Sequence, residues 1–228
     1  MSSLPRPLKW PPVFPLEKGL VLWLPFDDRS GARAYDRSGK ANHGTLYGPT
    51  WVAGRRGGAL SFNGISNYLL VADNPVLRLT NKGTITFWFR SGGVRKDWSA
   101  FVAKSSGGTT ADISYMVSVP DADYLTFVIS DGTTTNMLPT SFDFTNTNWH
   151  FVAARWDGSF LRMSLDLVET TPGVQTVNAQ STTHPLRLGK YNGGYFYGII
   201  GETRIYDRAL NAAEIKRLYE SELTLTRW

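Results

Sequence analysis

Two loops of this chain combine aromatic rings with amide and carboxylate groups, which are the side chains that hold a small polar ligand. One loop contains Asp97 and Trp98, after a glycine pair, and the other is the run from Tyr191 to Tyr197. Aromatic rings cover the apolar faces of a sugar, and a few planar polar groups orient it. The candidate ligand-binding residues are Asp97, Trp98, Tyr191, Asn192 and Tyr195. In the alternative interpretation, Tyr195 and Tyr197 alternate into the core as ordinary strand residues.

Carboxylates at the spacing that sugar hydrolysis needs are missing from the predicted strands. A glycosidase holds two carboxyl groups about 5–5.5 Å apart when it retains configuration. Asp121 and Asp123 have the spacing that places two side chains on one face of a strand, but they follow Pro120 in a turn. Asp27 and Asp28 are adjacent, so a strand would point them to opposite faces. A glycoside hydrolase is therefore the least favoured alternative.

Other catalytic patterns are also missing from the sequence. His43, His150 and His184 lie far apart, and no pair of them has the spacing of metal ligands on a helix. The chain has 0 Cys, which excludes a thiol nucleophile, a thiolate zinc site and a disulfide. No Gly-x-Ser-x-Gly motif marks a serine nucleophile. We therefore expect a protein that is not an enzyme.

Length and charge narrow the class of protein further. A chain of 228 residues suits one all-β domain with a full core. The formal net charge is +5, but the basic residues are scattered, so we expect no nucleic-acid partner. No stretch approaches the roughly 20 apolar residues that span a bilayer. Prolines interrupt residues 1–16, so we expect no cleavable export signal, and the localisation stays unknown.

The pattern from residue 19 onward is that of short strands separated by turns. Thr84–Arg90 alternates, with Ile85, Phe87 and Phe89 on one face. Hairpin turns are predicted at Asn63-Gly64, Pro120-Asp121 and Asp157-Gly158. One short helix is predicted near the C-terminus, because Asn211 and Glu214 form a capping box and Leu210 and Ile215 a hydrophobic staple. This pattern predicts an all-β, two-sheet antiparallel jelly-roll sandwich with one C-terminal helix.

Residues 1–18 form a proline-rich segment that we treat as an N-terminal arm, with the jelly-roll domain at residues 19–228. Prolines favour an extended backbone of about 3 Å per residue. The arm carries the large apolar residues Trp10, Val13 and Phe14. Apolar residues on an extended arm predict packing on the same domain or on a neighbouring subunit. The arm is therefore the candidate element for self-association or for contact with other subunits of an assembly.

Six segments follow one another in a recognisable order. They are Gly19–Asp28, Asp36–Leu46, Gly57–Gly64, Tyr68–Val71, Trp149–Ala153 and Tyr206–Leu210, the last continuing to Leu218-Tyr219. In order and spacing this series resembles laminin-G-like jelly-roll domains of the concanavalin A-like class. The resemblance covers roughly residues 19–220 and implies two antiparallel sheets. It also implies a recognition module for glycans, proteins or cell surfaces, since members of the family occur on enzymes, adhesins and phage virions.

Some members of that family hold a calcium ion, which takes six to eight oxygen ligands. The acidic residue usual after Phe62 is Asn63 here, and the usual Asp-Glu pair is Gly201-Glu202. Asn63 and Glu202 are therefore the remaining candidate ligands for calcium, the one cofactor that the resemblance suggests. In the alternative interpretation, Asn63 belongs to a turn and Glu202 pairs with an arginine.

Two functions remain from these observations. The favoured one is a non-catalytic structural and binding subunit of a larger assembly. Such a subunit would display a lectin-like sandwich on a virion surface, as a capsid-decoration, capsid or tail protein. The alternative is a stand-alone module that binds carbohydrate or a cell surface. The arm supports the first function, and the family resemblance supports the second.

Overall fold

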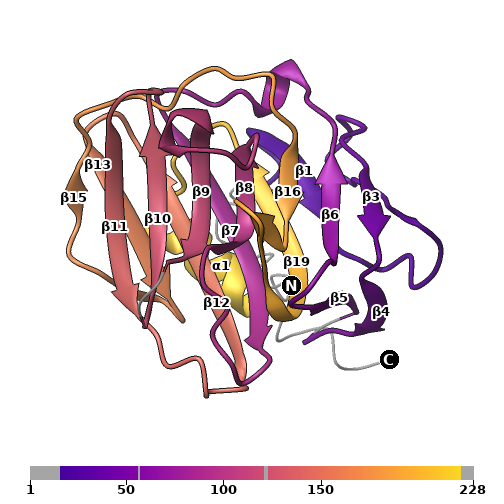
Figure 1. The fold of residues 1–228 in the computed structure, drawn as a ribbon. Helices are drawn as coiled ribbons and strands as arrows, with labels where there is room; N and C mark the ends of the chain where they lie inside the picture. Colours follow the sequence, from indigo (N-terminus) through magenta and orange to yellow (C-terminus); the bar gives the residue numbers. More distant parts are fainter. Residues whose placement is uncertain (1–15, 56, 121–122, 222–228) are drawn as a thin grey trace, which may run out of the picture.

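The computed structural model describes residues 16–55, 57–120 and 123–221, and it confirms the predicted sandwich. Two large antiparallel sheets stack face to face, and the helix α1 (Ala212–Ser221) lies against the outside of one of them (Figure 1). That sheet, sheet A, contains β1 (Leu20–Leu24), β4 (Thr50–Ala53), β5 (Gly58–Asn63), β7 (Gly83–Ser91), β12 (Trp149–Trp156), β13 (Phe160–Leu165), β14 (Val168–Glu169), β15 (Gly173–Val174) and β19 (Tyr197–Tyr206).

The second sheet, sheet B, contains β2 (Arg33–Ala34), β3 (Gly44–Tyr47), β6 (Tyr68–Val71), β8 (Ser99–Ser105), β9 (Ile113–Val119), β10 (Tyr124–Ser130), β11 (Thr135–Ser141) and β16 (Leu186–Leu188). A separate small hairpin joins β17 (Lys190–Tyr191) to β18 (Gly194–Tyr195). Two short 3₁₀ turns, η1 (Pro75–Leu77) and η2 (Thr110–Asp112), complete the elements. The strand order of sheet B is β11-β10-β9-β8-β16-β6-β3-β2.

Sheet A is organised around β19, which has different neighbours on its two sides. One side pairs with β7, and the other pairs first with β5 and then with β1. The path through the sheet is β14-β13-β12-β7-β19-β5-β4. The strand nearest the N-terminus therefore depends for its pairing on the strand that precedes the C-terminal helix.

The core lies between the sheets and follows the alternation of the strands. Ile85, Phe87 and Phe89 of β7 point into it and are fully buried, as predicted. The opposite face of β7 is buried as well, because Trp88 packs under α1 with Phe151 and other apolar residues.

Of the three predicted hairpins, the strands pair at two and do not pair at the third. The strands before and after Pro120 pair as β9 and β10, and those around Asp157-Gly158 pair as β12 and β13. The hairpin predicted at Asn63-Gly64 is wrong, because β5 joins sheet A and β6 joins sheet B. The Asn63 side-chain oxygen accepts hydrogen bonds from three backbone N–H groups of residues 65–67. At this turn the chain therefore passes from sheet A to sheet B instead of returning along sheet A.

The predicted helix cap is present at α1. Glu214 N–H donates to Asn211 Oδ1 at 2.9 Å, and Asn211 N–H donates to Glu214 Oε2 at 2.9 Å. Leu210 and Ile215 are both buried in the cluster under the helix, where the predicted staple places them. The arm residues Trp10, Val13 and Phe14 lie outside the described residues. In the part of the chain described, no helix has the length and apolar composition that a membrane crossing requires.

A buried carboxylate, Asp36, ties β1 to the loop between β2 and β3. Its two oxygens accept hydrogen bonds from the backbone N–H of Trp23 (2.8 Å), the N–H and hydroxyl of Ser38 (2.9 and 2.7 Å) and the N–H of Asn42 (2.9 Å). The Asn42 amide in turn donates to the Val21 carbonyl at 2.7 Å. Asp36 and Asn42, which belong to the segment Asp36–Leu46, therefore hold β1 through hydrogen bonds. We call this set of bonds the clasp on β1.

An ion pair between Lys104 and Asp73 lies near η1. Lys104 has a side chain with 0% exposure, and its Nζ lies 2.7 Å from Asp73 Oδ1 and 2.6 Å from the His184 carbonyl. Asp73 also accepts hydrogen bonds from Arg78. These bonds from Arg78, and next the contact with Lys104, hold the pKa of Asp73 below its usual value against the opposing effect of burial.

Candidate ligand-binding face

The structure brings together the two loops that the sequence singles out. The β17–β18 hairpin packs against the backbone of the loop that carries Asp97 and Trp98. A Cβ atom added to Gly194 would lie 2.4 Å from the Trp98 carbonyl oxygen and 2.6 Å from that of Asp97. Glycine at this position therefore permits the close approach of the two backbones.

Trp98 is held in an exposed and strained position beside this hairpin. Its side chain is 50% exposed, and its φ of +57° lies in the left-handed region that bulky residues rarely adopt. With Met116, Met137 and Tyr191 it lines a small apolar pocket of about 60 Å³. Strain of this kind costs about 1–3 kcal/mol and is concentrated at functional positions. Of the aromatic residues predicted to contact a ligand, Trp98 is the most exposed.

Tyr191 supports the hairpin from a buried position, whereas Asn192 is exposed and contacts neighbouring backbone. Tyr191 is 6% exposed and belongs to a small apolar cluster on the outer side of sheet B. Burial raises the pKa of its hydroxyl. The Asn192 side-chain amide lies against the carbonyls of Gly107 and Gly108, at 3.3 and 3.2 Å, where its NH₂ group acts as the donor. These residues fix the hairpin relative to the β8–β9 connection.

Tyr195 belongs to an aromatic surface that the sequence did not reveal. Its ring centroid lies 6.5 Å from that of Tyr68, which stacks on Tyr47 at 4.6 Å with an interplanar angle of 5°. We call Tyr47, Tyr68 and Tyr195 the tyrosine platform. Tyr47 and Tyr68 are directly paired residues on β3 and β6, and they point away from the core. Only this non-local pairing places them together.

The alternative in which Tyr195 and Tyr197 enter the core does not hold. Phe196 points inward and is 2% exposed, in contact with the rings of Phe62 and Phe101. Tyr195 is half-buried and Tyr197 is exposed. The run is therefore a strand-like segment whose middle residue anchors it and whose flanking tyrosines lie toward the surface.

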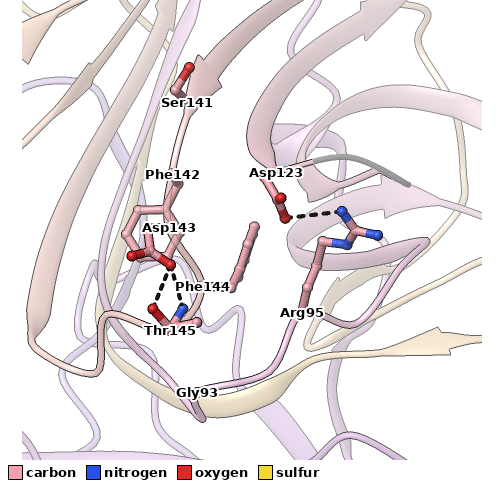
Figure 2. Close-up of a pocket in the computed structure, with 8 residues that line it drawn as sticks. All are labelled: Gly93, Arg95, Asp123, Ser141, Phe142, Asp143, Phe144 and Thr145. Carbon is pink, nitrogen blue, oxygen red and sulfur yellow. Dashed lines mark hydrogen bonds and ion pairs between the residues drawn. The ribbon is translucent and has the colours of Figure 1, made fainter.

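A groove of about 510 Å³ is lined by Gly93 and Arg95, from the loop that leads to Trp98, and by residues 123 and 141–145. Figure 2 shows Arg95 and Asp123 together on one side of it and Phe142, Asp143 and Thr145 on the other, with Phe144 between the two sides. Arg95 donates to Asp123 Oδ1 at 3.0 Å and to Asp97 Oδ1 at 2.6 Å. Asp97 is therefore bound to Arg95, and the loop is tied to the β9–β10 turn.

The carboxylate of Asp143 in this groove is held by its own turn. The hydroxyl and backbone N–H of Thr145 donate to it at 2.7 and 2.9 Å, which lowers the pKa of Asp143 (Figure 2). It therefore stays ionised in the neutral pH range. A carboxylate with this environment suits hydrogen bonding to ligand hydroxyls and not proton donation.

The two candidate calcium ligands are engaged elsewhere. Asn63 offers its side-chain oxygen to the turn described above, and Glu202 accepts a hydrogen bond from Trp23 Nε1 at 2.5 Å and pairs with Arg204. Glu202 lies five positions along β19 from Tyr197, the partner of Asn63, which is roughly 17 Å along a strand. Within residues 16–55, 57–120 and 123–221, no cluster of three or more histidine, aspartate or glutamate residues has the arrangement of a metal site.

Comparison with known proteins agrees with this architecture. Residues 63–216 match a laminin G family described as the concanavalin A-like lectin/glucanases superfamily. No curated protein matches the sequence of this chain. Among solved structures, the binding domain of Paraclostridial Mosquitocidal Protein 1 has a TM-score of 0.75 at 17% identity, covering 92% of this chain and 53% of that one.

Two further structures are similar. Domain 4 of AbnA, a GH43 extracellular arabinanase from Geobacillus stearothermophilus solved with arabinotriose, has a TM-score of 0.69 at 17% identity, covering 87% of this chain and 97% of that one. The binding domain of Botulinum Neurotoxin DC, solved with SialylT, has a TM-score of 0.72 at 12% identity, covering 90% and 52%. This chain spans about half the length of the two toxin binding domains. At these identities the likeness shows a shared fold.

Proposed function

This chain belongs to the concanavalin A-like lectin/glucanases superfamily, and from that we propose that it is a non-catalytic module that binds a glycan. The observation that carries the proposal is Trp98, an exposed ring held in a strained backbone next to the β17–β18 hairpin. Similar folds include domains that bind carbohydrates or receptors. The ligand would lie over Trp98 and across the outer face of sheet B, where aromatic and small polar side chains supply stacking and hydrogen bonds.

The protonation states of the described carboxyl groups support binding and not hydrolysis as the function. Sugar hydrolysis needs a carboxylic acid whose pKa is raised, so that it is protonated and can donate to the leaving group. Among the residues that the structure describes, every carboxyl group with a shifted pKa is shifted downward, by hydrogen bonds or by a neighbouring cation. His150 does not lie in an open site. It pairs with Asp166 at 2.7 Å, and its ring packs against Phe89 and Phe142.

The substitution Trp98→Ala tests the proposal. We expect a glycan identified on an array to bind the variant about two- to tenfold more weakly, since a stacked aromatic ring contributes roughly 0.5–1.5 kcal/mol beyond its area burial. Isothermal titration calorimetry measures the change. Phe160→Ala is the matched control, because Phe160 is also an exposed ring but lies on sheet A. Equal binding by the Trp98 variant and the wild type, or no glycan bound with or without calcium, would count against the proposal.

A second candidate function is that of a subunit displayed by an assembly such as a virion surface. The observation that favours it is the attachment of the chain before β1. Leu16 packs on the apolar cluster under α1, and Arg208 Nε donates to the Lys18 carbonyl at 2.7 Å. An arm leaving from this side would reach neighbouring subunits while the ligand-binding face of sheet B stays free.

Deletion of residues 1–15 tests the assembly function while it keeps Leu16 in place. We expect the full chain to form a defined oligomer and the truncated chain to be a monomer, as measured by multi-angle light scattering. The far-ultraviolet circular dichroism of both proteins should agree, which excludes unfolding as the cause. If both chains have the same mass in solution, the arm does not hold an assembly together.

A further inference from the structure

The tyrosine platform is a continuous aromatic surface built from three separate elements. The Tyr47 and Tyr68 rings stack at 4.6 Å, and the Tyr195 ring extends this surface from the β17–β18 hairpin. Tyr47 is 46% exposed, so the part of its ring that does not contact Tyr68 is open to a ligand. Apolar surface that stays open on a folded domain marks an interaction site.

A lysine lies in the middle of this surface. Lys190 Nζ is 4.7 Å from the Tyr68 ring centroid and 5.0 Å from that of Tyr195. Tyr195 is also its cross-strand partner in the hairpin. The two rings hold the ammonium group through cation–π contacts, which position the charge and leave it without an anionic partner. Among the described residues, no carboxylate forms an ion pair with Lys190.

Among the residues that the structure describes, the acidic side chains near this surface have partners of their own. Arg187 is the next cation, on the β16 strand beside β6, and its guanidinium donates to the Ser105 carbonyl. The nearby acidic residues are engaged elsewhere: Asp97 with Arg95 at 2.6 Å, and Asp112 with the backbone N–H of Thr109 at 2.8 Å. The platform therefore presents a positive charge among aromatic rings.

We propose that the tyrosine platform binds an acidic sugar, whose ring stacks on the tyrosines while its carboxylate or sulfate pairs with Lys190. The inference rests on the proposed function, because it names the class of glycan that this face takes. A neutral sugar would use the rings and leave the ammonium unpaired. An acidic sugar uses both, and a partly desolvated ion pair adds to the binding.

Matched pairs of glycans that differ only in the acidic group test the inference. Suitable pairs are sialyllactose and lactose, trigalacturonate and its methyl ester, and a sulfated oligosaccharide and its desulfated form. We expect at least one acidic member to bind the wild type about tenfold more tightly than its neutral partner. Lys190→Met should remove this preference by weakening the acidic ligand alone, and Lys190→Arg should keep most of it.

Salt and a control variant separate an ion pair from a general loss of structure. The preference should decrease as ionic strength rises, since salt screens charges near the surface. Lys216→Met, which removes an exposed lysine on α1 at the opposite face, should leave every affinity unchanged.

The possible outcomes separate the inference from the function on which it rests. Equal affinity for acidic and neutral partners, or equal weakening of both by Lys190→Met, overturns the inference. If the wild type binds only neutral glycans outside the panel, the inference is wrong and the proposed function stands. If no glycan binds at all, the proposed function fails and the inference fails with it.

Discussion

Replacement of Asp73 by alanine is expected to lower the free energy of unfolding by about 3–5 kcal/mol. The variant leaves Lys104, whose side chain is fully buried, with the His184 carbonyl as its remaining partner described above. An ammonium group that has lost its counter-ion in the interior bears an uncompensated desolvation cost. Urea unfolding followed by tryptophan fluorescence measures the change.

Two further variants show that the loss comes from the buried charge. The double variant Asp73→Leu with Lys104→Met removes both charges, so it should recover most of the stability that the single change loses. Lys216→Ala removes an exposed cation from α1 and should change the stability by less than about 0.5 kcal/mol. A single Asp73 variant as stable as the wild type would mean that Lys104 is solvated in solution.

The same pair predicts how stability depends on pH. Hydrogen bonds from Arg78, and next the contact with Lys104, hold the pKa of Asp73 below its unfolded value of about 3.9. A lowered carboxyl pKa contributes stability that is complete above the unfolded pKa and is lost as the pH falls through the folded one. The wild type should therefore lose stability below about pH 4, and the double variant should lose less over that range.

The second large effect is expected at Asp36. Asp36→Ala removes the acceptors of four hydrogen bonds and leaves the Trp23, Ser38 and Asn42 donors without them. Asn42 is buried, so its N–H group finds no water in exchange. Since each buried donor left unpaired costs about 1–3 kcal/mol, we expect a loss of about 3 kcal/mol or more.

A graded series makes this second prediction specific. Asp36→Asn keeps the shape and one oxygen, so its midpoint in urea should lie between those of the wild type and the alanine variant. Asp143→Ala removes a carboxylate with a similar local role in an exposed turn, and its effect should be much smaller. If Asp36→Ala and Asp143→Ala unfold at the same urea concentration, the clasp on β1 does not contribute as described.

The sequence predicted those features that depend on short stretches of chain. The capping box of Asn211 and Glu214 involves residues three apart, and the alternation of Thr84–Arg90 needs one strand alone. Both are therefore visible as local patterns. The turn at Asn63-Gly64 was recognised as a turn, but its direction depends on which sheet the next strand joins, and that is decided by contacts with distant strands.

The candidate site, like the fold, could be predicted from the sequence only where its features are local. Composition was enough to select the loops of Trp98 and Tyr195, because aromatic, amide and carboxylate groups gather there. It did not find Tyr47 and Tyr68, which lie in ordinary strands and meet only through the register of β3 with β6. Nor did composition predict the left-handed backbone of Trp98, which lies where Gly194 packs against that loop. The local signal that the sequence offers for the tyrosine platform is one tyrosine on the outer face of each strand, Tyr47 and Tyr68. Their contact depends on the pairing of β3 with β6.

The position of β19 has a consequence for how the domain is made. Strand β1 pairs only with β19 in the part of the chain described, with Trp23 opposite Arg204. During synthesis the apolar segment Leu20–Leu24 must wait for nearly the whole domain to leave the ribosome before it finds this partner. Pairings so distant in sequence form slowly, and an unpaired apolar strand is a template for aggregation. The emerging chain is therefore expected to depend on chaperones until β19 closes sheet A.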